Sequence, residues 1–235
     1  DSGKDIRPIT STVEPSKTPV AEPTVEPTVE PTMDPESDPR FTSTDSVLVF
    51  ANKKHKLPDG YVPGDLVSLS VSTAYGDVQM RQEAADAIAN MFNAANAEGI
   101  YPVVTTAYRG EDFQRQLYDN YVNRDGQEAA DTYSSRPGYS DHQTGLAADI
   151  SCASNGYNLN RDFENTAEGQ WLAQHAHEYG FVMRYPDGKQ DITGYMYEPW
   201  HFRYIGVEEA TALYNTDPNM TMEEYYGISG GNYAA

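Results

Sequence analysis

The sequence predicts an α+β fold: one compact domain with a small antiparallel sheet flanked by helices, preceded by a disordered proline-rich segment. Three observations lead to this prediction. Apolar residues recur at helical spacing over 78–98, β-branched residues cluster in short runs such as 103–106, and prolines recur every fourth residue near the N-terminus. Helices and short strands that occupy separate stretches favour a mixed α+β domain over a doubly wound parallel sheet.

Residues 1–45 differ in composition from the rest of the chain. Prolines stand at positions 15, 19, 23, 27, 31, 35 and 39, in a repeat of Val-Glu-Pro-Thr. Proline lacks the amide donor and fixes φ, so neither a helix nor a sheet can propagate through the repeat. We expect an extended Pro/Thr/Glu-rich linker that tethers the domain to the membrane or the cell wall. The alternative is an acidic leader without a specific role, because composition shows only that no core can form.

Residues 46–235 are numerous enough for a single catalytic domain with a sizeable core. The predicted elements are, in order, a strand over 46–51, helices over 78–98 and 111–123 on either side of a strand over 100–107, a strand over 146–151, a helix over 166–179, strands over 181–185 and 201–205, and one or two short helices over 207–226. Gly99 and Gly180 stand where two of these helices should stop. Thr221 and Glu224 form a capping-box pattern.

The charge balance excludes some partners. Acidic residues outnumber basic ones by 36 to 16, and the net charge is −20. A protein binds nucleic acid by neutralising phosphates with Lys and Arg, so this composition argues against a nucleic-acid partner. Anionic membrane surfaces are disfavoured for the same reason.

The single cysteine, Cys152, limits the chemistry of any metal site. It excludes an internal disulfide framework and a thiolate-rich site, so a metal must be held by imidazole and carboxylate groups. No run of 18 or more apolar residues occurs. The chain starts at a polar Asp-Ser-Gly rather than with Met and a basic-apolar leader, and we interpret it as a mature or trimmed form.

Two short segments predict a catalytic zinc site: Ser-Asp-His-Gln-Thr-Gly-Leu-Ala-Ala-Asp from position 140 and Glu-Pro-Trp-His from position 198. They supply three ligands that Zn²⁺ accepts, namely His142, Asp149 and His201. A catalytic zinc site has three protein ligands and an open position for water. Glu198 is close enough in sequence to His201 to take the proton of that water and deliver it to a leaving nitrogen. The expected reaction is metal-assisted amide hydrolysis.

The transition state of this reaction builds negative charge on the carbonyl oxygen, which a fixed cation stabilises. Arg109, at the end of the predicted strand over 100–107, is the first candidate. Arg136 is the second, either for the same oxyanion or for a substrate carboxylate held by its guanidinium.

The histidines have a simpler interpretation if each is taken alone, because a single histidine is more often a packed or surface residue than a ligand. The joint occurrence of both segments supports the metal site. His175 and His177 lie two apart on a predicted helix and point to different faces, so they cannot share a metal.

These motifs resemble the VanY-type D-alanyl-D-alanine carboxypeptidases and their L,D-carboxypeptidase relatives among the M15B zinc peptidases. The resemblance covers roughly residues 46–228. It is carried by Ser140-x-His142-x-x-Gly145-x-Ala147-x-Asp149, by Glu198-Pro-Trp-His201, by Leu48-Val49-Phe50-Ala51-Asn52-Lys53 with the loop over 57–63, and by Tyr108-Arg109 with Gln114.

The resemblance implies an extracellular enzyme of the bacterial cell envelope that removes the terminal D-alanine from peptidoglycan stem peptides. By matching positions, His142, Asp149 and His201 would bind zinc, and Glu198 would be the base. Arg109, Gln114 and Ser140 would contact the substrate. The family's Ser-Gly-Tyr-Arg-Ser is Thr-Ala-Tyr-Arg-Gly over 106–110, which affects substrate preference more than catalysis. Asp141 stands where many relatives have glutamate.

Several functions remain compatible with these motifs. A monomeric D,D-carboxypeptidase is the leading hypothesis. An L,D-carboxypeptidase acting on tetrapeptide stems and an endopeptidase use the same site. A non-catalytic peptidoglycan-binding module with a structural zinc ion is the alternative from another class. The presence of Glu198 and the lack of a fourth protein ligand argue against it, since structural zinc sites are normally closed.

Overall fold

A computed structural model describes residues 33–233 of the chain. Most of the predicted proline-rich linker, residues 1–32, lies outside the described residues. No helix within 33–233 combines the length and the apolar character that a membrane crossing requires.

The described residues before position 46, the expected start of the domain, belong to the same compact unit as the residues that follow. A short 3₁₀ turn, η1 (Pro35–Ser37), and helix α1 (Pro39–Thr42) lie in this stretch, each capped by the aspartate before its proline. Proline is compatible with the first position of a helix, where its missing amide would have no partner. The buried ring of Phe41 packs edge-on against Phe50, its ring centroid 5.8 Å away, and so attaches this segment to the domain.

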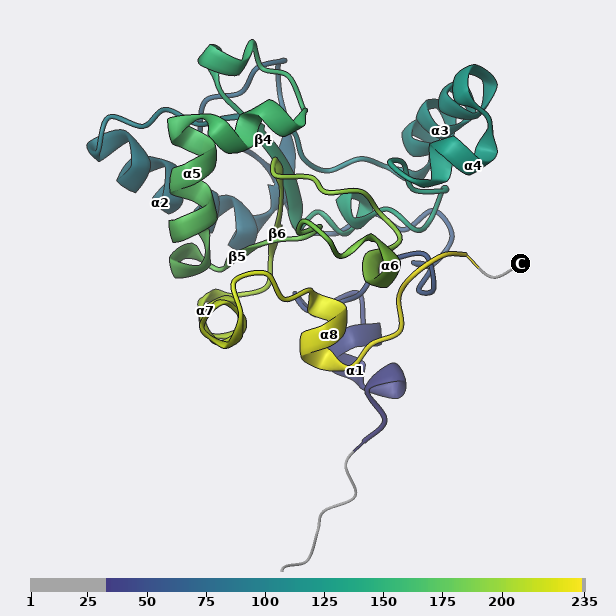
Figure 1. The fold of residues 1–235 in the computed structure, drawn as a ribbon. Helices are drawn as coiled ribbons and strands as arrows, with labels where there is room; N and C mark the ends of the chain where they lie inside the picture. The colour runs from purple at the N-terminus through teal and green to yellow at the C-terminus, as the bar shows by residue number, and fades with distance from the viewer. Residues whose placement is uncertain (1–32, 234–235) are drawn as a thin grey trace, which may run out of the picture. The chain divides into compact units, whose positions relative to one another are not determined.

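A four-stranded antiparallel sheet forms the centre of the domain (Figure 1), as predicted. The strand order is β3 (Val103–Thr106), β4 (Ala147–Ser151), β6 (His201–Tyr204), β5 (Phe181–Met183). All four strands fall within predicted segments. A separate two-stranded sheet, β1 (Leu66–Ser68) and β2 (Gln79–Arg81), was not predicted.

Most helices lie in the segments for which the sequence predicted a helix. They are α2 (Gln82–Ala97), α3 (Glu111–Asp125), α4 (Gln127–Asp131), α5 (Ala167–His175), α6 (Gln190–Thr193), α7 (Val207–Thr216) and α8 (Met222–Tyr226). The short helices α4 and α6 were not predicted. Gly180 follows the 3₁₀ turn η5 (Ala176–Tyr179) with a φ of 88°, which glycine adopts readily. Both hydrogen bonds of the capping box between Thr221 and Glu224 are present at α8.

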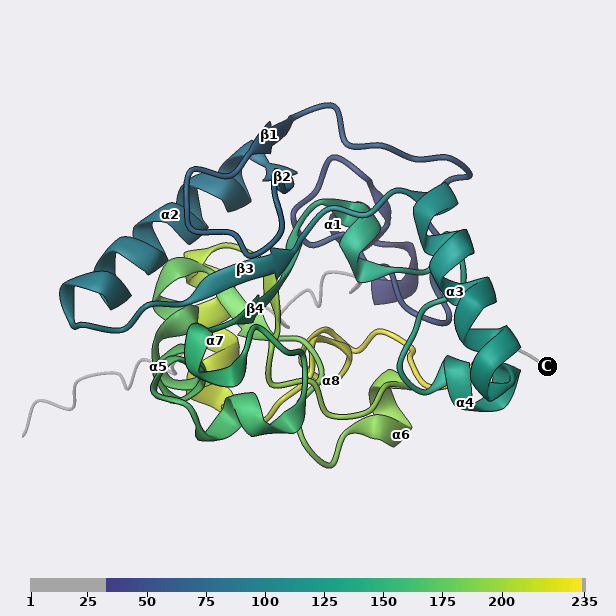
Figure 2. The ribbon, with the colours of Figure 1, turned by 90° about the horizontal axis from the view of Figure 1, so that it is seen from above.

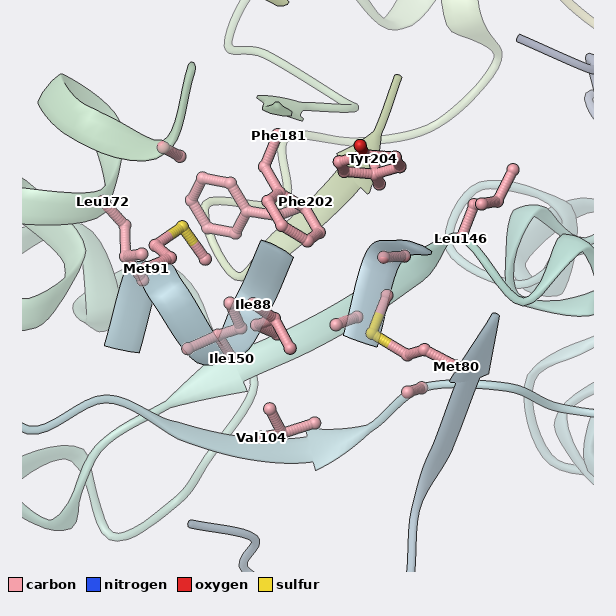
Figure 3. Close-up of a cluster of buried hydrophobic side chains, with 14 of the residues drawn as sticks. Met80, Ile88, Met91, Val104, Leu146, Ile150, Leu172, Phe181, Phe202 and Tyr204 are labelled. Atoms are coloured by element: carbon pink, nitrogen blue, oxygen red, sulfur yellow. The ribbon is translucent and has the colours of Figure 1, made fainter. Parts of the chain in front are cut away.

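One face of the sheet packs against α2 and α5 (Figure 2). Figure 3 shows Ile150 of β4 and Phe202 of β6 gathered with Ile88 and Met91 of α2 and Leu172 of α5. Each such side chain, when fully buried, stabilises the fold by about 1.5–3 kcal/mol. Because side chains alternate along a strand, the intervening residues of β4 and β6 point to the opposite face. That face is the one on the side of α3 and α4 (Figure 1).

The predicted strand over 46–51 is not a strand. The segment is buried but has turn and irregular structure, and Val49 is 2% exposed. The carbonyl groups of Val47 and Val49 accept hydrogen bonds of 2.8 and 2.7 Å from Nη2 of Arg203. A buried carbonyl needs a hydrogen-bond partner, and here a guanidinium group supplies it in place of a neighbouring strand.

Candidate metal centre and active site

The sheet register places two of the three candidate ligands side by side. Asp149 of β4 and His201 of β6 are direct partners in the antiparallel register, so their side chains lie on the same face. Nδ1 of His201 lies 3.4 Å from Oδ1 of Asp149. This pairing explains why residues 52 positions apart in the sequence meet at one point.

The third ligand comes from the 3₁₀ turn η2 (Asp141–Thr144), directly before β4. Gly145 ends this turn with a φ of 70°, and the chain then enters the strand. A Cβ at Gly145 would lie 3.0–3.1 Å from side-chain atoms of Arg81, Leu66 and Pro63, at a φ that other residues rarely adopt, so a substitution here would be strained. The turn brings Nε2 of His142 to 3.3 Å from Oδ2 of Asp149.

Hydrogen bonds on the far side of each imidazole orient the ligands. Nδ1 of His142 lies 2.8 Å from the carbonyl oxygen of Ala107, which can only accept, so the proton is on Nδ1 and Nε2 is left as a ligand atom. Nε2 of His201 lies 3.1 Å from Oδ2 of Asp141, an arrangement in which Nε2 donates and Nδ1 is left as a ligand atom. These tautomers follow from the partners of each ring.

The three residues fit a zinc ion. Their ligand atoms all lie within 4.8 Å of one another, and the residues are buried. Oδ1 of Asp149 is buried and accepts no hydrogen bond from residues 33–233. A buried carboxylate oxygen without a donor is costly unless a cation satisfies it. Two imidazole nitrogens and one carboxylate oxygen form a donor set of the kind found in catalytic zinc sites.

Glu198 lies beside this cluster. Its Oε2 is 3.2 Å from Nδ1 of His201, and its backbone amide donates to the carbonyl of Tyr185 at 3.0 Å. Burial raises the pKa of Glu198, although His201 acts in the opposite direction. A carboxylate with a raised pKa takes and returns a proton near neutral pH more readily than an exposed one.

Arg109 and Gln114 form a pair at the edge of the cluster. Nη1 of Arg109 donates to Oε1 of Gln114 at 2.8 Å, and Nη2 lies 3.9 Å from Oδ2 of Asp149. The backbone amide of Arg109 donates to the carbonyl of His142 at 3.2 Å. Gln114 is almost fully buried, and its Nε2 donates to the carbonyl of Ser135 at 2.7 Å. The guanidinium of Arg109 is therefore held next to the metal cluster from two sides.

A pocket of about 500 Å³ surrounds these groups. Its lining residues include the cluster with Glu198, Arg109, Gln114 and Ser140, together with Leu117, Tyr121, Tyr133, Ser134, Ser135, Asp141, Leu159, Asn160, Arg161, Tyr185, Tyr195, Met196 and Trp200. Polar and charged side chains outnumber aromatic and aliphatic ones in this lining by twelve to eight, so the pocket offers many hydrogen-bonding groups to a small polar ligand.

Arg136 does not belong to this pocket, so its predicted role as a substrate ligand is not supported. Its guanidinium donates to Asp131 at 2.8 Å and lies over the ring of Tyr233. Arg136 has a local acidic partner within five residues, and this pair turns it away from the metal cluster. The sequence motif around Arg136 did not indicate that this residue pairs with Asp131.

A layer of buried charges behind His201 was missed in the sequence. Asp141 accepts from Nη1 of Arg203 at 2.6 Å, and the fully buried Arg184 forms two hydrogen bonds, of 2.7 and 2.8 Å, with Glu223. Burial opposes ionisation of Asp141, but Arg203, His201 and Arg184 outweigh it and hold the pKa of Asp141 well below its usual range. The available signal was the occurrence of Arg184 and Arg203 within apolar strand segments.

The other two histidines that the sequence singled out lie elsewhere. His177 stacks on Tyr214 with ring centroids 3.7 Å apart, and Nδ1 of His175 lies 3.0 Å from Glu178.

Comparison with known proteins identifies the family. The sequence matches the family described as VanY, D-alanyl-D-alanine carboxypeptidase, over residues 77–207. It is 44% identical over 186 residues to the putative carboxypeptidase YodJ of Bacillus subtilis (strain 168). The aligned region covers 77% of this chain and 67% of YodJ. It is 35% identical to a D-alanyl-D-alanine carboxypeptidase of Enterococcus faecalis (strain ATCC 700802 / V583), over 58% of this chain and about half, 51%, of that protein.

Solved structures agree with the sequence comparison. The LdcB LD-carboxypeptidase superimposes with a TM-score of 0.75 at 40% identity, covering 81% of this chain and 90% of LdcB. A variant of the vancomycin-resistance D,D-pentapeptidase VanY in complex with Zn(II) superimposes with a TM-score of 0.64 at 31% identity, covering 76% of this chain and 98% of that chain. The family match, the identities and the shared fold lead to one conclusion: this chain belongs to the VanY D-alanyl-D-alanine carboxypeptidase family of M15B zinc peptidases.

Proposed function

We propose that this chain is a zinc-dependent carboxypeptidase that releases the terminal D-alanine from peptidoglycan stem peptides. The observation that carries the proposal is the position of Glu198, 3.2 Å from the ligand atom of His201 at the edge of the buried His142, Asp149 and His201 cluster. A cluster that only bound a structural metal would need a fourth ligand and no adjacent base.

Each residue of the site has a defined task. His142, Asp149 and His201 would hold a zinc ion, which when bound would supply Lewis-acid polarisation of the scissile carbonyl and activation of water. Glu198 accepts the proton of the attacking water at its carboxylate and then donates it to the leaving amine nitrogen. Burial raises the pKa of Glu198, which favours acceptance of the proton by this carboxylate.

Arg109 supplies the fixed positive charge. Its guanidinium is held by Gln114 and stabilises the charge that develops on the carbonyl oxygen or binds the terminal carboxylate of the peptide. Ser140 is a buried residue of the pocket wall, two positions before His142, and we assign it to binding of the peptide.

The stereochemistry at the scissile bond has two candidates. D,D specificity follows from the family description. L,D specificity is favoured by the greater similarity to LdcB, an LD-carboxypeptidase, than to VanY, with identities of 40% and 31%. Gly110 follows Arg109 directly where the family pattern has serine, so the hydroxyl of that serine is missing beside the arginine.

We also infer that the protein acts outside the cell as a monomer, tethered through residues 1–32 to the membrane or the wall. The support is the Val-Glu-Pro-Thr repeat, whose prolines favour extended chains, and the location of peptidoglycan itself.

The decisive experiment is digestion of purified muropeptides with added zinc, followed by mass spectrometry. Loss of one alanine from a pentapeptide supports D,D activity, and loss of one alanine from a tetrapeptide supports L,D activity. Internal cleavage would identify an endopeptidase instead. Binding of peptidoglycan without release of D-alanine would identify a binding module and overturn the proposal.

The mechanism is tested with Glu198→Ala. We expect D-alanine release to fall by about 10²–10⁴-fold, the usual contribution of a general base. Zinc content, measured on the purified variant, should stay at the wild-type level. Glu208→Ala, at an exposed position in the first turn of α7, is the matched control. Unchanged release by Glu198→Ala would contradict the assigned mechanism.

A further inference from the structure

The segment over 228–233, here called the C-terminal strap, is built into the domain. A Cβ at Gly230 would lie 2.2 Å from the carbonyl oxygen of Ile192, and a Cβ at Gly194 would lie 2.5 Å from the carbonyl oxygen of Gly231. Only glycine allows two backbones to approach this closely. The strap is therefore packed directly against the end of α6, which leads into the pocket residues Tyr195 and Met196.

Tyr233 joins the strap to the loop over 134–136. Its hydroxyl oxygen accepts a hydrogen bond of 2.7 Å from the backbone amide of Arg136. The guanidinium carbon of Arg136 lies 4.0 Å from the centroid of the Tyr233 ring, within the range of a cation–π interaction. The ring of Tyr139 packs edge-on against Tyr233 with centroids 5.2 Å apart. Two contacts of Arg136 and one of Tyr139 thus hold this part of the chain against the strap.

The same loop supports the substrate side of the pocket. The carbonyl oxygen of Ser135, the residue before Arg136, accepts a hydrogen bond of 2.7 Å from Nε2 of Gln114. Oε1 of Gln114 in turn accepts a hydrogen bond of 2.8 Å from Nη1 of Arg109. Oγ of Ser135 lies 2.7 Å from the hydroxyl of Tyr195, which joins the loop to the other pocket wall.

Lys53 connects the chain segments that carry Asp131 and Gly194. Its Nζ donates to the carbonyl oxygens of Asp131 and Gly194, each at 2.5 Å. It also lies 4.5 Å from the ring centroid of Tyr195 and 5.3 Å from that of Tyr233. The strap and Lys53, which do not line the active-site pocket, are therefore connected to two segments that do: the loop over 134–136 and the segment with Tyr195.

We propose that Tyr233 is a positioning residue for substrate binding, which acts through the backbone of residues 135–136 and through Gln114 to fix the guanidinium of Arg109. The proposal rests on the proposed function, in which Arg109 and Gln114 contact the peptide. Tyr233 does not line the active-site pocket, so its effect on substrate has to pass through these hydrogen bonds.

The first test compares Tyr233→Ala and Tyr233→Phe with Tyr214→Ala, which removes a partly exposed tyrosine that stacks on His177 away from the pocket. We expect Tyr233→Ala to raise KM for a D-alanine-terminated peptide by about threefold to tenfold, because the loop is no longer held by the hydroxyl and the ring of Tyr233. The zinc affinity should stay within about twofold, because the metal cluster has its own supports. The kcat should also stay within about twofold, because this proposal takes Arg109 as the group that binds the terminal carboxylate of the peptide. Tyr233→Phe keeps the ring and should show a smaller rise, and Tyr214→Ala should show none.

A double-mutant cycle tests the route. In a Gln114→Ala background the path from the loop to Arg109 is already broken, so adding Tyr233→Ala should change KM by less than about 1.5-fold. An equal rise in KM in both backgrounds would overturn the route through Gln114. A wild-type KM in Tyr233→Ala would overturn the positioning role.

Hydrogen exchange separates this proposal from the proposed function. The amide of Arg136 should exchange slowly in the full-length chain and much faster in Tyr233→Phe, which lacks the acceptor oxygen, whereas Tyr214→Ala should leave it slow. The NMR signal of the Gln114 side-chain amide should shift in Tyr233→Ala. If the wild-type chain released no D-alanine, the proposed function would be wrong, and these two signals would still decide whether Tyr233 positions the loop. Unchanged exchange at Arg136 in Tyr233→Phe would refute the contact on which the proposal depends.

Discussion

Oδ2 of Asp141 lies 3.1 Å from Nε2 of His201, on the side of the imidazole that faces away from the metal cluster. The other oxygen of the same carboxylate accepts a hydrogen bond of 2.6 Å from Arg203. One buried carboxylate therefore orients a candidate zinc ligand and neutralises a buried guanidinium. Asp141 therefore contributes both to the metal site and to the stability of the sheet.

Asp141→Asn should weaken both the binding of zinc and the stability of the fold. The amide of asparagine can donate to Nε2, which would move the imidazole proton to Nδ1, the atom that must bind the metal. We expect zinc affinity, measured by competition with a chromophoric chelator, to fall by about 10–100-fold. The free energy of unfolding should fall by about 3–5 kcal/mol, because Arg203 loses its buried anionic partner. Asp162→Asn, at an exposed position, is the control, and a wild-type zinc affinity in Asp141→Asn would contradict the role given to Asp141.

In the buried ion pair of Arg184 and Glu223, removal of one partner should destabilise the fold more than replacement of both partners by apolar residues. Two hydrogen bonds, of 2.7 and 2.8 Å, join the end of β5 to α8 inside the protein. Glu223→Met alone should cost about 3–5 kcal/mol in urea unfolding, because the buried guanidinium of Arg184 loses the carboxylate that accepts both of these hydrogen bonds. The double variant with Arg184→Met should recover most of this loss. Equal and additive losses would show that the two side chains act independently.

Removal of the metal should lower stability as well as activity. Zinc that binds only the folded chain stabilises it by about 4 kcal/mol at a concentration 1,000 times its Kd. We therefore expect the midpoint of thermal unfolding to rise on zinc addition and to return to its metal-free value with a chelator. Asp149→Ala should abolish the zinc-dependent rise. The same rise in that variant would locate the bound zinc elsewhere.

Lys53 should make stability depend on pH in the alkaline range. Burial lowers the pKa of Lys53 to about 8, against 10.5 for the unperturbed group, although Asp131 acts in the opposite direction. Between these values the unfolded chain binds a proton that the folded chain does not, so stability rises with pH. The stabilisation is complete above the unfolded value and is lost as pH falls through about 8.

The comparison with Lys53→Met isolates this effect. From pH 8 to pH 10 the free energy of unfolding of the wild type should rise relative to the variant by about 2 kcal/mol. Tyrosine titration affects both proteins and cancels in the difference. A difference that does not change with pH would show that Lys53 keeps its ordinary pKa.

The sequence was sufficient wherever a local rule decides the structure. The helix α2 follows from its apolar spacing, Gly180 ends its helical segment at the expected position, and Thr221 with Glu224 caps α8. The prediction from sequence failed for some of the prolines, because proline interrupts regular structure but can also begin a helix. The prolines of the repeat predicted disorder up to residue 45, but Pro35 and Pro39 begin short helical turns because an aspartate precedes each.

For the candidate site, the sequence alone singled out the residues to which we assign the chemistry: two histidines, an aspartate and a glutamate in motifs of defined spacing. Only the tertiary structure decided how they are supported. Asp149 meets His201 because β4 and β6 pair in one register, and Arg136 lies outside the pocket because Asp131 pairs with it. Arg203 replaces a strand partner for residues 47 and 49, more than 150 positions away. Such contacts depend on which segments the fold brings together, and local spacing carries no information about that.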